Sequence, residues 1–213
     1  MKLIVEKNKQ GFETKEFREY LKTPVLKSEI TTSESDELRR TLESAHNQFG
    51  GIGISATQIG IKKRACYIKL GEHYDSEELF LLNPSIIERS NEGFLFYEGC
   101  LSMPRTMEAP IKTIRSCKIV VSTDNLGELT FEINPEGDKD SVSKETMLTV
   151  VVQHEIDHLD GITIKDRVYT TTVKNKQKYG RNDIIIMKSP KGDMVEVKYK
   201  KANEYFLKGY EIV

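Results

Sequence analysis

The stretch from Glu145 to Leu159 constrains the fold of this chain more than any other segment. It contains no Gly or Pro, and its apolar and histidine side chains recur at three- and four-residue intervals: Met147, Val150, Val151, His154 and His158. This spacing places them on one face of an α-helix. Because three consecutive valines are poor helix formers, tertiary burial must stabilise the helix. We therefore predict a buried helix over 145–159, one stripe of which ends in two histidines.

Within this helix, the sequence His154-Glu155-Ile156-Asp157-His158 predicts a metal site. Imidazoles at positions i and i+4 share a helix face and can bind one metal ion, with Glu155 beside them. The alternative is a pair of hydrogen-bonded histidines that pack in the core without a ligand. A catalytic divalent metal usually has three protein ligands and leaves a position for water, so a third ligand is required.

Cys100, which lies in the sequence EGCLS at 98–102, is the candidate for that third ligand. A thiolate is a strong metal donor, and the preceding Gly99 allows close approach of the backbone. Cys66 and Cys117 lie in strand-like runs, where we predict small buried apolar residues. An odd number of cysteines without an export signal argues against a disulfide framework.

The composition is that of a globular protein, with 38% hydrophobic and 31% charged residues. The longest apolar runs are far shorter than the ~20 residues of a membrane span. The N-terminal sequence MKLIVEKNKQ introduces charges before an apolar core of signal-peptide length can form. We therefore expect a cytoplasmic protein that does not interact with membranes.

Patterns of secondary structure indicate an α+β fold. A helix is predicted over 33–49, with Ser33 and Asp36 as a capping box and Gly50 as its C-terminal stop. Strands are predicted at 64–70, 79–82, 117–122 and 129–133. We expect mixed, mainly antiparallel sheets around the central metal-binding helix, followed by a small C-terminal ββαβ appendage.

A third block, GIGISATQ at 51–58, follows the first predicted helix. Its small residues let another backbone come close, and Gln58 offers an amide donor. It does not match a phosphate-binding loop, because no Gly-Lys-Ser/Thr follows. Together the three blocks resemble the motifs GxGLAAxQ, EGCLS and QHExDHLxG of the peptide deformylase family, the last of which reads QHEIDHLDG here. The resemblance covers roughly residues 20–168, including Asn83-Pro84.

The resemblance implies a hydrolase that removes the N-formyl group from the initiator methionine of nascent polypeptides and releases formate. The metal would be held by Cys100, His154 and His158, with water as the fourth ligand. Glu155 would act as general base and acid while the metal-bound hydroxide attacks the formyl carbon. The Leu101 backbone N–H and the Gln58 side chain would stabilise the oxyanion. Ferrous iron is the family's common metal, and the ligand set also suits Zn²⁺, Ni²⁺ or Co²⁺.

The same resemblance implies how an N-formylmethionyl peptide would bind. An extended peptide would pair with the backbone of Ile52 and Gly53 on one side and of Gly99 on the other. The methionine side chain would enter an apolar pocket formed by Phe96, Met147, Val150 and Val151. Ordinary core packing is the alternative role for these four residues.

Three features depart from the family pattern. Ser55 replaces the usual alanine and adds a hydroxyl that needs a partner if it is buried. Pro110-Ile111 stands where the family often has Pro-Arg, so the cation that pairs with Glu98 would be Arg105 or Arg115. An insertion at 134–144 precedes the metal-binding helix and has no predicted function.

The C-terminal region lies outside the resemblance. We expect a catalytic domain over 1–169, a linker over 170–182 and a basic appendage over 183–213. Residues 171–213 contain ten Lys/Arg and five Asp/Glu. This excess allows contact with ribosomal RNA, with Tyr179, Tyr199 and Tyr205 available to stack on bases, whereas no DNA binding is expected. A solvated lysine-rich surface is the alternative.

Two other functions remain open from the sequence. A zinc peptidase of the HExxH type would share the helix and take a downstream ligand, such as Asp160 or Asp166. An inactive metal-bearing homologue would act as a binding module through the appendage. Metal retention after loss of Cys100 would indicate the peptidase, and absence of turnover would indicate the module.

Overall fold

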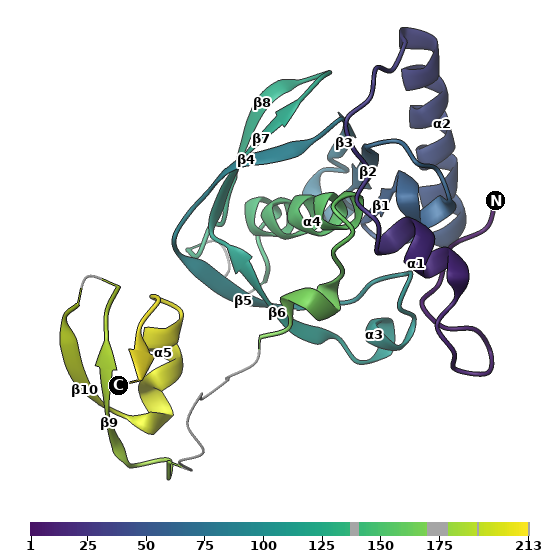
Figure 1. The fold of residues 1–213 in the computed structure, drawn as a ribbon. Helices are drawn as coiled ribbons and strands as arrows, with labels where there is room; N and C mark the ends of the chain where they lie inside the picture. Colours follow the sequence, from purple (N-terminus) through teal and green to yellow (C-terminus); the bar gives the residue numbers. More distant parts are fainter. Residues whose placement is uncertain (137–140, 170–178, 191, 213) are drawn as a thin grey trace.

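The first part of the chain forms three antiparallel sheets (Figure 1). The structure, a computed structural model, describes residues 1–136, 141–169, 179–190 and 192–212. One sheet has the order β1-β2-β3, a second the order β4-β7-β8, and β5 pairs with β6. Their bounds are β1 Gly53–Ser55, β2 Ala65–Lys69, β3 Glu78–Leu82, β4 Ser85–Arg89, β5 Gly93–Glu98, β6 Ile111–Ser116, β7 Lys118–Thr123 and β8 Gly127–Glu132.

Helix α4 (Lys144–Leu159) lies between the first two sheets (Figure 1). Its residues Val151, Val152 and Ile156 share one core cluster with residues of β2, β3 and β7. Every residue from Thr149 to Leu159 is buried. This part of the helix is therefore enclosed on all sides and does not have a single buried stripe. This enclosure explains how a run of valines is held in a helix, and it places Glu155, Asp157 and the two histidines of α4 inside the protein.

The remaining helices of this part cover its edge. Helix α2 (Thr32–Phe49) packs Leu38, Leu42 and Ala45 against the first sheet. Its N-terminal capping box uses Thr31 and Glu34, so the predicted pair Ser33 and Asp36 was wrong by two residues, whereas Gly50 does end the helix. Helices α1 and α3 and three short 3-10 helices complete this part: α1 Lys15–Leu21, η1 Ala56–Ile59, η2 Glu72–Tyr74, α3 Arg105–Glu108 and η3 Ile164–Arg167.

The predicted strands at 64–70, 79–82, 117–122 and 129–133 are confirmed as β2, β3, β7 and β8. Strands β1, β4, β5 and β6 were not predicted. In the β5-β6 pair, buried polar side chains replace the apolar residues that would mark an inward face: Glu98, Thr113 and Arg115. Hydrophobic alternation therefore does not mark these strands.

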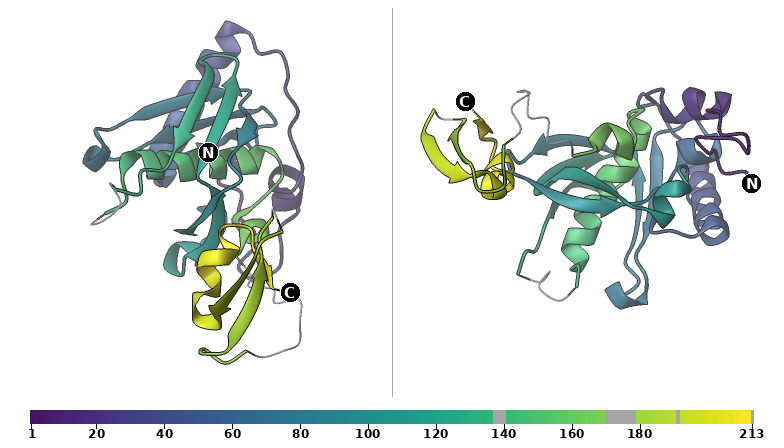
Figure 2. Two further views of the ribbon diagram at one scale, coloured as in Figure 1. Left: turned by 90° about the vertical axis from the view of Figure 1, so that its left-hand side faces the viewer. Right: turned by 90° about the horizontal axis from the view of Figure 1, so that it is seen from below.

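The C-terminal elements, which lie at one end of the molecule in Figure 2, have a core cluster of their own. Strands β9 (Ile184–Lys188), β10 (Met194–Lys198) and β11 (Glu211–Ile212) form a sheet of order β10-β9-β11. The 3-10 helix η4 (Tyr199–Lys201) and helix α5 (Ala202–Phe206) lie between β10 and β11 in the chain. Residues 170–178 of the predicted linker and 137–140 of the insertion lie outside the described residues. No helix in the described ranges has the length and apolar character of a membrane span.

Candidate functional site

Cys100, His154 and His158 meet at one point although they come from two distant segments. Cys100 follows β5 in a turn, and the two histidines lie one turn apart on α4. One ligand atom from each residue lies within 4.8 Å of the other two. The Cys100 Sγ atom is 3.3 Å from His158 Nε2. The structure therefore brings together the three residues that the sequence proposed as metal ligands.

A buried network of ion pairs orients His154. Glu98 accepts a hydrogen bond of 2.8 Å from His154 Nδ1, which directs the other ring nitrogen toward the cluster. Arg115 binds both oxygens of Glu98, with Nε–Oε1 and Nη2–Oε2 distances of 2.6 and 2.8 Å. Arg115, and not Arg105, is thus the cation that the sequence left undecided.

The network continues along α4 to Asp157. Arg115 Nη1 donates to Asp157, which also accepts two hydrogen bonds from Arg167. Thr113 donates its hydroxyl to Glu98. Sequence reasoning did not find the roles of Thr113, Asp157 and Arg167, although Asp157 stands within the histidine motif. These contacts fix the register of α4 against β5 and β6.

The network keeps Glu98 ionised. Burial would raise the pKa of Glu98, but hydrogen bonds from His154 and Arg115 lower it well below its ordinary value. Burial and the neighbouring His154 lower the pKa of His158 well below the usual range. A neutral His158 can donate a lone pair to a metal without first losing a proton.

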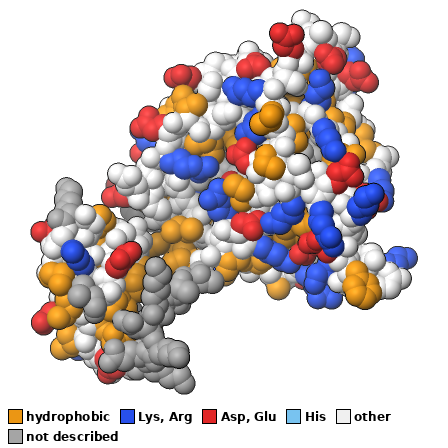
Figure 3. All heavy atoms as spheres, in the orientation of Figure 1, with side chains coloured by type: hydrophobic (Ala, Val, Ile, Leu, Met, Phe, Trp, Pro, Cys, Tyr) orange, Lys and Arg blue, Asp and Glu red, His pale blue; other side chains and the backbone are white. Residues whose placement is uncertain are grey.

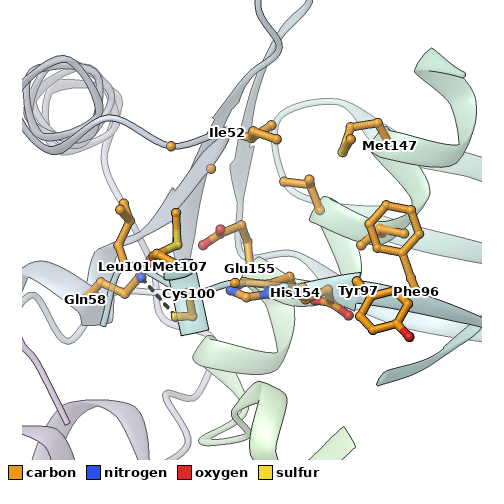
Figure 4. A pocket seen from close by; sticks show the side chains of 16 residues that line it. Ile52, Gln58, Phe96, Tyr97, Cys100, Leu101, Met107, Met147, His154 and Glu155 are labelled. Carbon is orange, nitrogen blue, oxygen red and sulfur yellow. Dashed lines mark hydrogen bonds and ion pairs between the residues drawn. The ribbon is translucent and has the colours of Figure 1, made fainter. Parts of the chain in front are cut away.

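Glu155 points into the site from the same helix (Figure 4). It is buried, and its Oε2 atom has no hydrogen-bond partner among the described residues. Burial raises the pKa of Glu155 to about 7. Strand β1 passes so close that a Cβ atom on Gly53 would lie 2.6 Å from Glu155 Oε1, so glycine is required there. A carboxyl group with a pKa near neutrality can both accept and donate a proton.

Gln58 approaches the cluster from η1 (Figure 4). Its Nε2 atom donates to Ser102 Oγ at 3.2 Å and lies 3.9 Å from Cys100 Sγ. Its Oε1 atom accepts hydrogen bonds from the Ser55 backbone N–H at 2.9 Å and from the Ser55 hydroxyl at 3.2 Å. The amide nitrogen is thereby held toward the site.

A cavity of about 220 Å³ opens beside the cluster. All residues that the sequence assigned to substrate binding line this cavity: Ile52, Gly53, Phe96, Gly99, Met147, Val150 and Val151. The cavity is also lined by the candidate catalytic and metal-binding residues Gln58, Cys100, Leu101, His154 and Glu155. Tyr97 and Met107 also line the cavity and were not predicted; both are exposed at its rim. A Cβ atom on Gly99 would lie 2.9 Å from the backbone carbonyl oxygen of Thr106, so this glycine is required as well.

The residues of the cluster fit a catalytic divalent metal. A thiolate and two imidazoles are three donors of the types that bind catalytic divalent metals, and three protein ligands leave a position for water. The Oε2 atom of buried Glu155, which has no partner among the described residues, is the kind of polar group that a bound water or ligand satisfies.

Ionised Glu98 is expected to stabilise the fold in a pH-dependent way. Its folded pKa is depressed, so as pH falls the unfolded chain takes up the proton first, at about pH 4. The stabilisation is therefore present above about pH 4 and lost in more acidic solution. In denaturant titrations of metal-free protein, the free energy of unfolding should fall between pH 6 and pH 3 by about 1 kcal/mol more for wild type than for Glu98→Gln. Equal losses would contradict the ion-pair assignment.

Comparison with known proteins places these features in one family. A sequence model of the polypeptide deformylase family matches residues 16–174. The peptide deformylase of Dictyoglomus thermophilum is 36% identical over 158 residues, covering 74% of this chain and 92% of that protein. The peptide deformylase of Natranaerobius thermophilus is 36% identical over 150 residues, covering 68% of this chain and 86% of that protein.

Solved structures agree with the sequence matches. A peptide deformylase from Synechococcus elongatus in complex with actinonin has a TM-score of 0.62 at 25% identity, covering 80% of this chain and 82% of that chain. A class I type b peptide deformylase from Acinetobacter baumannii has a TM-score of 0.55 at 25% identity, covering 78% of this chain and 100% of that chain.

Proposed function

Because the chain belongs to the polypeptide deformylase family, we propose that it is a metal-dependent hydrolase that removes the N-formyl group from the initiator methionine of nascent polypeptides. One observation carries the proposal: three convergent metal donors face a buried carboxylate at the inner end of a largely apolar cavity. Release of formate and of a free amine from a formyl-methionyl peptide by metal-replete protein tests it. Absence of turnover would favour the inactive binding module.

Cys100, His154 and His158 would hold the metal, and α4 is in this proposal the central metal-binding helix. A divalent ion held there would polarise both the attacking water and the formyl oxygen. We propose Fe²⁺ as the native ion, with Zn²⁺, Ni²⁺ and Co²⁺ as substitutes. Glu155 accepts a proton from the water as the new C–O bond forms and returns it to the amine nitrogen as the C–N bond breaks.

The developing oxyanion needs donors that are already in place. Gln58 Nε2 lies at the cluster, and Leu101 follows the cysteine ligand and lines the cavity. We assign the Gln58 amide and the Leu101 backbone N–H as the oxyanion donors.

The substrate would bind as an added strand. β1 is an edge strand of its sheet, and β5 is paired only with β6 among the described strands. Backbone pairing with Ile52, Gly53 and Gly99 would orient the peptide between these edges. The methionine side chain would fill the apolar part of the cavity, against Phe96, Met147, Val150 and Val151.

Ser55→Ala is expected to lower kcat about threefold and leave KM unchanged, because the buried hydroxyl supplies one neutral hydrogen bond to Gln58. Thr57 is 3.2 Å from the Ser55 hydroxyl and extends the same chain of hydrogen bonds. The effect should vanish in a Gln58→Leu background, where no amide remains to be held. An equal loss in both backgrounds would show that Ser55 acts on stability alone.

We further propose a catalytic domain over 1–169, a linker over 170–182 and a separate ββαβ appendage over 183–213. The separate core cluster of Ile185, Met187, Val197 and Ala202 supports this division. The A. baumannii enzyme is matched over 100% of its length by 78% of this chain, which supports independent folding of the catalytic part. A cytoplasmic location remains a prediction from the sequence.

Ribosome contact through the C-terminal region also remains a proposal. Its support is the basic excess of residues 171–213. The face in Figure 3 shows acidic as well as basic side chains on the C-terminal part, which suits the alternative of a solvated surface. If the region docks, a chain ending at Tyr169 should co-sediment with ribosomes at least about tenfold less than the full chain at moderate salt. Equal co-sedimentation would refute docking.

A further inference from the structure

A second cavity lies within the C-terminal elements, away from the metal cluster. It measures about 560 Å³ and opens between the start of this region and η4 and α5. Its wall contains three aromatic residues, two cationic residues and an amide: Tyr179, Tyr199, Phe206, Arg181, Lys200 and Asn203. None of the described residues that line it is acidic. Such a wall suits a ligand that is both planar and anionic.

The aromatic side chains are fixed in position. Tyr179 and Tyr199 have ring centroids 5.4 Å apart at an interplanar angle of 36°. Both, together with Phe206, pack against the appendage core. For a third ring to fit between the two tyrosines, their rings would have to lie about 7 Å apart, which is twice the ~3.5 Å contact distance between carbon atoms. A planar ligand would therefore stack on the outside of this pair.

The two cations are available for an anion. Arg181 and Lys200 are exposed, and neither forms an ion pair with any acid in the described ranges. The nearby Asp183 carboxylate accepts a hydrogen bond from the Gly180 backbone N–H. The backbone N–H of Lys200 donates to the Arg181 carbonyl at 3.0 Å, so the two cationic residues are held side by side.

We propose that this cavity binds one unstacked nucleotide, whose base stacks on Tyr199 and whose phosphate pairs with Arg181 and Lys200. Aromatic faces accept any base, and neighbouring cations bind the phosphate. Asn203, whose Oδ1 accepts a hydrogen bond from Tyr169 at 3.3 Å, presents its amide to the base edge. The site is independent of the deformylase chemistry.

The nucleotide can come from a free mononucleotide or from single-stranded RNA. The test uses the full chain and fluorescence anisotropy of a labelled decauridylate, with unlabelled UMP as competitor and a duplex RNA of equal length as comparison. We expect saturable binding of the single strand and weaker binding of the duplex. Competition by UMP would identify a free nucleotide as sufficient, whereas binding of the oligonucleotide without competition would identify RNA as the source.

Tyr199→Leu should weaken binding about tenfold, whereas Tyr199→Phe should retain it, because stacking requires the ring. Arg181→Gln, at an exposed position, should weaken binding without affecting folding and should reduce its salt dependence. Arg39→Gln with Arg40→Gln, on the exposed side of α2, is the matched control. Absence of saturable binding, equal affinity for the duplex, or an equal loss in the control would overturn the proposal.

Discussion

Glu155→Gln is expected to lower kcat for a formyl-methionyl peptide by about a thousandfold, within the ~10²–10⁴-fold range of general acid–base catalysis. The amide keeps the size of the side chain but can neither accept nor return the proton. Burial already favours the neutral carboxyl, because it raises the pKa to about 7, so the substitution should not disturb the fold. The measurement is the release of free amine, with the metal content determined on the same samples.

Glu145→Gln is the matched control for this experiment, since Glu145 lies on the same helix and is exposed. The control should retain wild-type turnover. If Glu155→Gln retained more than about a tenth of the wild-type kcat with full metal occupancy, the assignment of Glu155 as the proton carrier would be wrong.

Cys100→Ala is expected to weaken metal binding by more than about 100-fold. Loss of a residue that only hydrogen-bonds to a metal ligand costs up to about 100-fold in affinity, and loss of a ligand itself should cost more. Turnover should fall in parallel, because only two of the three protein donors remain. Metal affinity measured by competition with a chelator checks the first effect, and amine release checks the second. Cys117→Ala, at a half-buried cysteine outside the cluster, should change neither.

The same variant separates the proposal from a zinc peptidase. A peptidase would take its third ligand downstream and keep its metal without Cys100. The downstream acids are engaged elsewhere: Asp160 is 2.7 Å from Arg64 Nη1, and Asp166 is 2.5 Å from Lys22 Nζ. Retention of metal by Cys100→Ala would nevertheless support the peptidase.

The candidate ligands could be predicted from the sequence because chemistry restricts them. Two histidines one helical turn apart share a face whatever surrounds the helix. Cys100 could be proposed from its neighbours, but only the fold shows that the turn after β5 reaches α4. Sequence spacing alone gives no distance between segments 54 residues apart.

The sequence named Arg105 and Arg115 as candidate partners of Glu98 but could not choose between them, and the reason is geometric. In the β5-β6 pair, Glu98 stands opposite Ile111, whereas Arg115 stands opposite Phe94. The two side chains are offset by four residues along the strands, and they still meet because the Arg115 side chain is long and lies along the sheet. The strands themselves were missed for a related reason, since buried polar residues that support the site replace the apolar residues by which a strand is recognised.

The cavity in the C-terminal elements also could not be predicted from the sequence alone. The tyrosines could be named from the sequence as candidates for base stacking. The contact between Tyr179 and Tyr199 joins residues 20 positions apart, and the absence of acids among the described residues of the wall is a property of the folded surface.

The central claim is that one sulfur and two imidazole nitrogens converge on a single ion that retains a site for solvent. X-ray absorption spectroscopy of the metal-replete full chain measures this ligand set directly. We expect one sulfur and two imidazole neighbours of the metal, with the sulfur lost in Cys100→Ala. A metal shell without sulfur in the wild-type protein would contradict it.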